Sequence, residues 1–180
     1  MSITKKELAF GLIHNFFEGK VDKAGVDYIH HPLHVAKAVA DHGEEYEIVG
    51  LLHDIVEDTE VSLEFLRDAG FSNNVVEAVD AITKRKDKDG EIEEYENYLA
   101  RVKSNKIARI VKLADIEHNS DASRLPEELR KAHEGHLKKY QKAKKYLSDW
   151  QNVFLVGMEC ADNLGSRAFI LRLQEDDDEF

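Results

Sequence analysis

The chain contains little of what disulfide-stapled or loop-rich proteins need: it has one cysteine, two prolines and ten glycines among 180 residues. The single thiol, Cys160, excludes an internal disulfide and a zinc site built from cysteines. It also favours a reducing compartment, so we expect a cytoplasmic protein. Because turn residues are scarce, we expect long helices rather than many short strands.

Long apolar runs are absent as well. No stretch approaches the roughly 18 apolar residues of a membrane-spanning helix, and the N-terminal residues lack the apolar core of a signal peptide. Acidic residues outnumber basic ones by 36 to 25, which gives a formal net charge of −11. We therefore expect neither a membrane nor a nucleic-acid polymer as a partner. An anionic ligand would have to be attracted by a metal ion or by a local group of basic residues.

A helical pattern runs along nearly the whole chain. Apolar residues recur with the 3.6-residue period, and the composition, 42% hydrophobic and 34% charged, is that of a globular domain. The predicted helices span residues 4–17, 32–43, 45–56, 62–70, 73–83, 92–103, 106–118, 126–146 and 149–172. We predict an all-α fold, a single helical bundle over residues 1–173 followed by an acidic tail over 174–180. Apolar residues of the last helix belong either to the core or to a subunit contact, so the sequence leaves open whether the protein forms a homo-oligomer.

The sharpest chemical feature is the pair His53-Asp54 within the segment GLLHDIVEDTE. The apolar neighbours predict that this pair lies near the buried side of a helix, where a carboxylate is costly unless it is paired or bound to a metal. Glu57 follows His53 by four residues, so we expect it on the same helix face, with Asp58 beside it.

Two other segments add residues of the same kind. His31 directly precedes Pro32, which predicts an extended backbone at the start of a helix. Asp115 lies on a strongly apolar helix, with Asn119 one turn later. Two histidines and two aspartates form a mixed nitrogen and oxygen ligand set, which suits manganese, iron, cobalt or zinc better than calcium. Such an ion acidifies a coordinated water, and a nearby carboxylate can position that water or take its proton.

Each residue also has a plainer explanation. His53 alone is compatible with a hydrogen-bonded core histidine, and Asp115 with an ion pair to Lys112. The remaining histidines considered are expected at the surface: His30, His34, His42, His133 and His136.

Three motifs together resemble the HD-domain metal-dependent phosphohydrolases, specifically the hydrolase domain of the RelA/SpoT family and its stand-alone small alarmone hydrolases. They are YIHHPLHVA (28–36), LLHDIVEDT (51–59) and VKLADIEHN (111–119), in the family's order. The resemblance implies an HD-domain helical bundle that hydrolyses guanosine 3′,5′-bispyrophosphate, (p)ppGpp, to GDP or GTP and pyrophosphate.

The resemblance also implies roles for individual residues. It implies that the metal, usually manganese, is bound by His31, His53, Asp54 and Asp115. It implies that Glu57 and Asp58 orient or activate the water and that Asn119 lines the nucleotide site. The candidates for binding the phosphate groups of the substrate are Lys20, Lys23, Lys112 and Arg124.

The sequence departs from the family pattern near the site. Asp22 stands where relatives often have arginine, and Ile116-Glu117 stands where many carry Arg-Leu. Two alternatives therefore stay open: an HD phosphohydrolase acting on another nucleotide or phosphoester, and a nucleotide sensor without turnover. The intact ligand set and the Glu57-Asp58 pair argue against the sensor.

Overall fold

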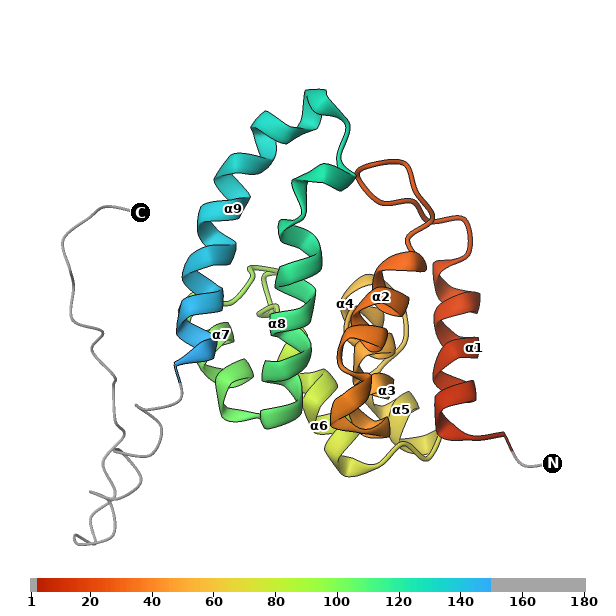
Figure 1. Cartoon of the computed structure of the whole chain (residues 1–180). Coiled ribbons are helices and arrows are strands. Elements are labelled where there is room, and N and C mark those ends of the chain that lie inside the picture. The colour runs from red at the N-terminus through yellow and green to blue at the C-terminus, as the bar shows by residue number, and fades with distance from the viewer. Residues whose placement is uncertain (1–2, 150–180) are drawn as a thin grey trace, which may run out of the picture. The chain divides into compact units, whose positions relative to one another are not determined.

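The structure is a computed structural model that describes residues 3–149, and this part of the chain is built from helices joined by short loops (Figure 1). The α-helices are α1 (Lys5–Phe17), α2 (His30–Ala38), α3 (Glu44–Leu52), α4 (Ile55–Asp58), α5 (Leu63–Asp68), α6 (Asn73–Ile82), α7 (Tyr95–Ser104), α8 (Lys106–Ser120) and α9 (Glu127–Ser148). Two 3₁₀ turns join them: η1 (Ala40–His42) and η2 (Ala122–Arg124).

The all-α prediction is confirmed. Extended pairing within residues 3–149 is limited to two isolated bridges, Val21–Asp27 and Lys86–Ile92. No helix in this range is long and apolar enough to cross a bilayer. The predicted helix over 149–172, except for its first residue, and the predicted domain end and tail at 173–180 lie outside the described residues.

Local signals set the starts of several helices. Thr4 and Glu7 form the predicted capping box of α1, with the Thr4 hydroxyl accepting from the Glu7 amide. Ser62 and Ser72 cap α5 and α6 in the same way, and Asn105 caps α8. These caps satisfy amide groups that a helix cannot satisfy itself.

The predicted helix over 45–56 is wrong in one respect, because the chain leaves the helix at His53-Asp54 and forms two helices, α3 and α4. The Gly50 carbonyl lies in the last turn of α3, where carbonyls lack a helical partner, and it accepts a hydrogen bond from His53 Nδ1 at 2.8 Å. His53 and Asp54 keep right-handed backbone angles between the two helices. Their side chains converge, with His53 Nε2 3.0 Å from Asp54 Oδ2.

The predicted extended backbone at His31 is also wrong. Helix α2 begins at His30, so His31 is helical and Pro32 is the third helical residue. Proline is accommodated there because an amide in the first turn has no acceptor within the helix. The connector predicted over 119–125 is shorter as well, since α8 continues to Ser120 and keeps Asn119 one turn beyond Asp115.

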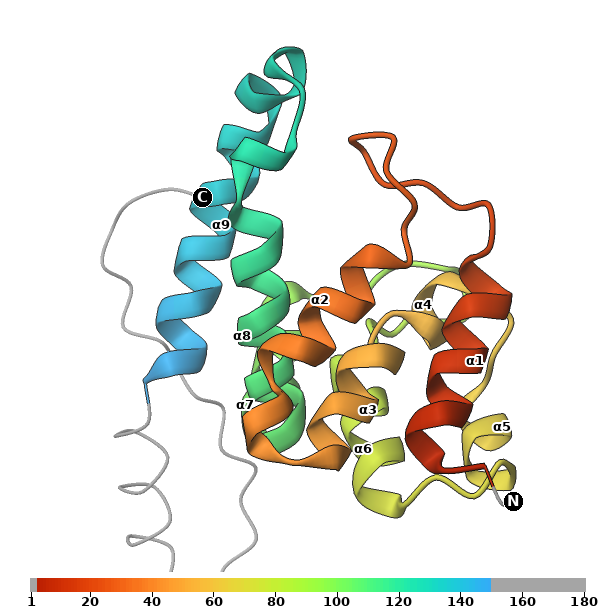
Figure 2. The ribbon, with the colours of Figure 1, turned by 45° about the vertical axis from the view of Figure 1, so that its right-hand side comes forward.

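Helix α8 is the central element, packing against α2, α3, α6, α7 and α9 (Figures 1 and 2). Helices α2 and α3 also pack closely, because a Cβ atom built on Gly50 would lie 2.6 Å from the Ala36 Cα. The first turn of α2, the end of α3 and the middle of α8 consequently lie together.

We expect Gly50→Ala to destabilise the fold by about 1–3 kcal/mol, because the added methyl meets backbone that cannot rotate away. Gly11→Ala is the matched control: Gly11 is also helical, and its added methyl meets no atom within 4 Å. That control should stabilise the protein by roughly 0.5–1 kcal/mol through helix propensity. Urea unfolding of both variants tests this, and equal stability of the two would contradict the packing argument.

Candidate metal centre

The structure brings together the four residues predicted as ligands. His31 Nε2 lies 3.1 Å from both His53 Nε2 and Asp115 Oδ1. Asp54 Oδ2 lies 3.0 Å from His53 Nε2 and 3.5 Å from His31 Nε2. The ligand atoms of His31, His53 and Asp115 all lie within 4.8 Å of one another, and all three residues are buried. These three residues form a possible metal site, and Asp54 stands beside it, partly exposed.

Hydrogen bonds orient both imidazoles. His53 Nδ1 donates to the Gly50 carbonyl, which directs Nε2 to the cluster. His31 Nδ1 lies 2.8 Å from His118 Nδ1, and Arg124 Nη1 lies 3.0 Å from the same His118 nitrogen. Since arginine only donates, His118 Nδ1 is the acceptor and His31 Nδ1 the donor. Both Nε2 atoms are thereby available as ligands, the arrangement that outer hydrogen bonds impose on metal-binding histidines.

Hydrogen bonds also orient the two carboxylates, Asp115 and Asp54. Asp115 accepts hydrogen bonds from Lys112 Nζ at 2.8 Å and from Asn119 Nδ2 at 2.6 Å. The Tyr28 hydroxyl donates to Asp54 Oδ2 at 2.5 Å. Two ionised groups therefore have fixed oxygen positions beside the two imidazoles.

The electrostatics of the cluster favour a cation. Burial by itself lowers the pKa of His31, but hydrogen bonds to Asp115 and Asp54 and their charges outweigh burial and raise it to about 9. Burial raises the pKa of Asp115, but the Lys112 charge and the His31 hydrogen bond hold it well below its usual range. The negative potential that retains a proton on His31 would equally stabilise a divalent ion in place of that proton. The donor set, two imidazole nitrogens and two carboxylate oxygens, fits a borderline divalent metal.

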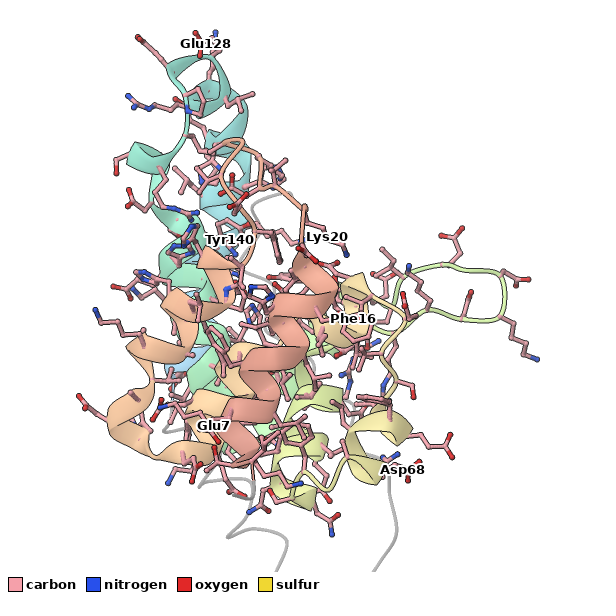
Figure 3. All side chains as sticks on the ribbon, turned by 90° about the vertical axis from the view of Figure 1, so that its right-hand side faces the viewer. Glu7, Phe16, Lys20, Asp68, Glu128 and Tyr140 are labelled. Atoms are coloured by element: carbon pink, nitrogen blue, oxygen red, sulfur yellow. The ribbon has the colours of Figure 1, made fainter. Side chains whose placement is uncertain are left out.

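A cavity of about 470 Å³ opens onto this cluster. Tyr140 of α9, labelled in Figure 3, lines this cavity together with His31 of α2. Of the residues predicted to act beside the metal, those lining the cavity are Lys23, Glu57, Asp58, Lys112, Asn119 and Arg124. Lys20 does not line it and instead donates to the Asp58 carbonyl at 2.6 Å.

Glu57 lines the cavity, and Lys84 fixes its carboxylate. Its Oε1 lies 2.7 Å from Lys84 Nζ, and its Oε2 accepts the Lys84 backbone N–H at 3.2 Å. Partial burial and the charges of Asp54 and Glu57 raise the pKa of Asp58.

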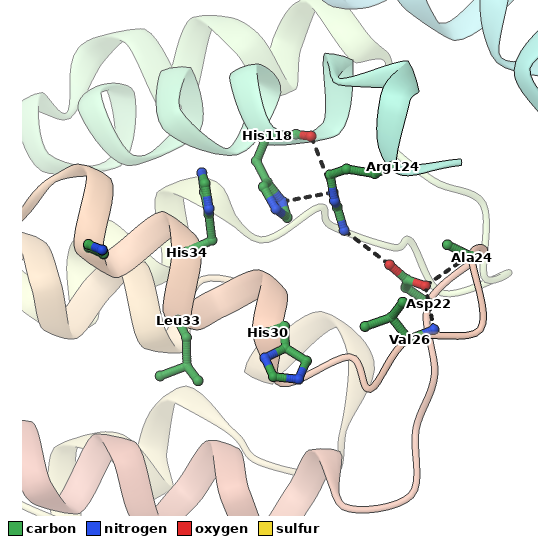
Figure 4. A pocket seen from close by; sticks show the side chains of 9 residues that line it. Asp22, Ala24, Val26, His30, Leu33, His34, His118 and Arg124 are labelled. Atoms are coloured by element: carbon green, nitrogen blue, oxygen red, sulfur yellow. Dashed lines mark hydrogen bonds and ion pairs between the residues drawn. The ribbon is translucent and has the colours of Figure 1, made fainter. Parts of the chain in front are cut away.

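Two of the predicted phosphate ligands already have acidic partners. Lys112 pairs with Asp115, and Arg124 Nη2 pairs with Asp22 Oδ2 at 3.0 Å. Figure 4 shows Arg124 bridging from Asp22 to His118 beside a second cavity of about 510 Å³. Asp22 therefore binds an arginine contributed by η2.

Several residues around the cluster were not predicted from the sequence. His118 received no role, although it follows Asp115 by three residues and shares its helix face. His133, expected at the surface, is partly buried and lines the cavity, together with His136, Lys84, Lys139, Tyr95 and Tyr140. No spacing rule could place α9 opposite the cluster, because that contact depends on the turn through η2. The surface prediction holds for His30, His34, His42 and His136.

Comparisons with known proteins agree with this geometry. The family model described as HD domain matches residues 9–131. A GTP pyrophosphokinase of Streptomyces coelicolor is 38% identical over 120 residues, 63% of this chain and 14% of that protein. A guanosine-3′,5′-bis(diphosphate) 3′-pyrophosphohydrolase of Haemophilus influenzae is 32% identical over 110 residues, 57% of this chain and 16% of that protein. The matched segments are 14–16% of the length of these two relatives.

A solved structure shares the fold. It is described by the words "A metazoan ortholog of SpoT hydrolyzes ppGpp and plays a role in starvation responses". It matches with a TM-score of 0.64 at 21% identity, covering 88% of this chain and 94% of that one.

We expect the purified protein to carry about one transition-metal ion per chain and His53→Ala or Asp54→Ala to lose it, because each removes a donor from the cluster. His42→Ala, at an exposed histidine of η1, is the control and should keep the metal. Elemental analysis after dialysis measures the content. A chelator should also lower the melting temperature of wild type, because an ion that binds only the folded state stabilises it. Equal metal content in wild type and all variants would contradict the assignment of a metal site to this cluster.

Proposed function

The chain belongs to the HD domain family, and from this premise we propose that it is a metal-dependent phosphohydrolase that hydrolyses (p)ppGpp at the 3′ position. The observation that carries the proposal is the cluster of His31, His53, Asp54 and Asp115 facing a cavity lined by both acidic and basic side chains. Relatives named as (p)ppGpp 3′-pyrophosphohydrolases support the choice of substrate. The single cysteine is consistent with action in the reducing cytoplasm.

Manganese is the metal we propose, held by the two imidazoles and the two aspartates. When bound, it would supply acidification of water and polarisation of a phosphoryl oxygen. The chain fixes the donors before any ion binds: Tyr28 holds Asp54, Lys112 and Asn119 hold Asp115, and His118 holds His31.

Glu57 and Asp58 are the groups we propose for handling the attacking water. Both line the cavity, and they differ in their surroundings. Glu57 is anchored by Lys84, which suits a residue that positions water. The raised pKa of Asp58 suits a residue that accepts a proton from it. Lys23, Asn119 and Arg124 remain proposed contacts to the nucleotide, and Lys112 acts through Asp115.

The first test of this function is the product. With manganese, the protein should release intact pyrophosphate from the 3′ position of (p)ppGpp and leave the 5′ pyrophosphate in place, as resolved by anion-exchange chromatography. A panel of other nucleotides is assayed beside it. Stepwise release of single phosphates, or cleavage of another nucleotide while the alarmone stays intact, would assign a different substrate. Binding of the alarmone without turnover would make the protein a sensor.

The second test concerns the carboxylates. Glu57→Gln and Asp58→Asn should keep the metal while kcat falls by roughly 100-fold or more, the usual scale for losing acid–base assistance. Glu60→Gln, at an exposed carboxylate that does not line the cavity, should leave kcat unchanged. Loss of metal from Glu57→Gln would instead make Glu57 a ligand, and unchanged turnover would remove it from the mechanism.

A further inference from the structure

Most basic side chains around the cavity are already neutralised by acidic partners. Lys84 pairs with Glu57 and Lys112 with Asp115. Arg124 pairs with Asp22. A substrate phosphate would have to compete with these carboxylates, so these three cations offer little free positive charge. In a chain with a formal net charge of −11, the attraction of an anionic substrate depends on the cations that remain.

Two lysines that line the cavity form no ion pair with an acidic side chain of residues 3–149: Lys23, in the loop after α1, and Lys139 of α9. His133, His136 and Tyr140 of α9 line the cavity together with Lys139. The rings of His133, His136 and Tyr140 lie 6.1–6.4 Å apart, centroid to centroid. Lys139 Nζ lies 3.8 Å from the centroid of the Tyr95 ring, and no acidic side chain within residues 3–149 forms an ion pair with it. We call His133, His136 and Lys139 the α9 face.

His133 supplies an independent observation. Its Nε2 atom is buried, yet it has no hydrogen-bond partner within the described part of the chain. Buried polar atoms in native proteins nearly always have a partner, and an exception indicates a water, ion or ligand that binds there. Because His133 lines the cavity, that partner would occupy the cavity.

We propose that the α9 face binds the phosphate group of the substrate that is remote from the metal. For (p)ppGpp this is the 5′ pyrophosphate, and in this respect the inference rests on the proposed function. A bispyrophosphate has two anionic groups, and the cluster on α2, α3 and α8 engages only the one that is cleaved. The α9 face lines the same cavity and offers one ammonium and two imidazoles to the other group.

Lys139→Met and Lys138→Met form a matched pair, because both lysines are exposed on α9 but Lys138 does not line the cavity. Lys139→Met should raise KM for (p)ppGpp roughly tenfold, the scale of one charge-assisted hydrogen bond. The kcat should stay within about twofold and the metal content should not change, since a remote contact contributes uniform binding. Lys138→Met should change neither constant. With guanosine 3′-diphosphate, which lacks 5′ phosphates, the effect of Lys139→Met should vanish; an equal effect on both substrates would overturn the assignment to the 5′ group.

His133→Phe tests the unpaired nitrogen while keeping an aromatic ring of similar size. If Nε2 serves only the substrate, the variant should be at least as stable as wild type in thermal unfolding, and KM should rise several-fold. An unchanged KM in a folded His133→Phe protein would show that His133 does not contact the substrate. His136→Gln, at an exposed position, should raise KM without changing the melting temperature.

A calorimetric titration with inorganic pyrophosphate separates this inference from the choice of nucleotide. It uses metal-loaded wild type, Lys139→Met and Lys138→Met, each freed of unbound metal. Binding should weaken several-fold in Lys139→Met alone. If wild type fails to hydrolyse (p)ppGpp but the titration shows this difference, the proposed substrate is wrong and the α9 face still binds phosphate. If the three proteins bind pyrophosphate equally, the α9 face is not a phosphate site, whatever the substrate.

Discussion

Two carboxylates, Asp54 and Asp115, are held beside two imidazoles among packed helices, and ionised carboxylates in such surroundings are stable only when cations and hydrogen-bond donors compensate them. Much of the local structure provides that compensation. Lys112 and Asn119 reach Asp115 along one face of α8, and Tyr28 reaches Asp54 from the loop before α2. The imidazole and carboxylate groups held together in this way form a possible site for a divalent ion.

The helix is interrupted at the cluster. His53 and Asp54 lie between α3 and α4, and the side chains of both face the cluster. The break also frees the Gly50 carbonyl to orient His53. The absence of a side chain at Gly50 lets α2 approach closely enough to bring His31 alongside. One glycine thus contributes both to the packing of α2 and to the orientation of a proposed ligand.

Charge is distributed unevenly between the two sides of the cavity. On the side that holds the cluster, Lys84, Lys112 and Arg124 are each paired with an aspartate or glutamate, so these three cations mainly orient carboxylates. The side formed by α9 carries Lys139, which no described acidic residue neutralises, together with two histidines and aromatic rings. Under the proposed function, this division lets an acidic protein bind an anionic substrate, because the long-range repulsion is offset locally at the α9 face.

The sequence by itself determined the all-α class, most helix boundaries and the residues of the cluster, because apolar period, capping residues and short motifs are local properties of the chain. It did not reveal the break at His53-Asp54, because the apolar pattern continues through the break while the hydrogen bonds do not. The role of His118, the pairing of Arg124 with Asp22 and the place of His133 opposite the cluster were decided only by the tertiary structure. Each of these contacts joins residues from elements whose relative position depends on how whole helices pack, and no spacing along the chain encodes that.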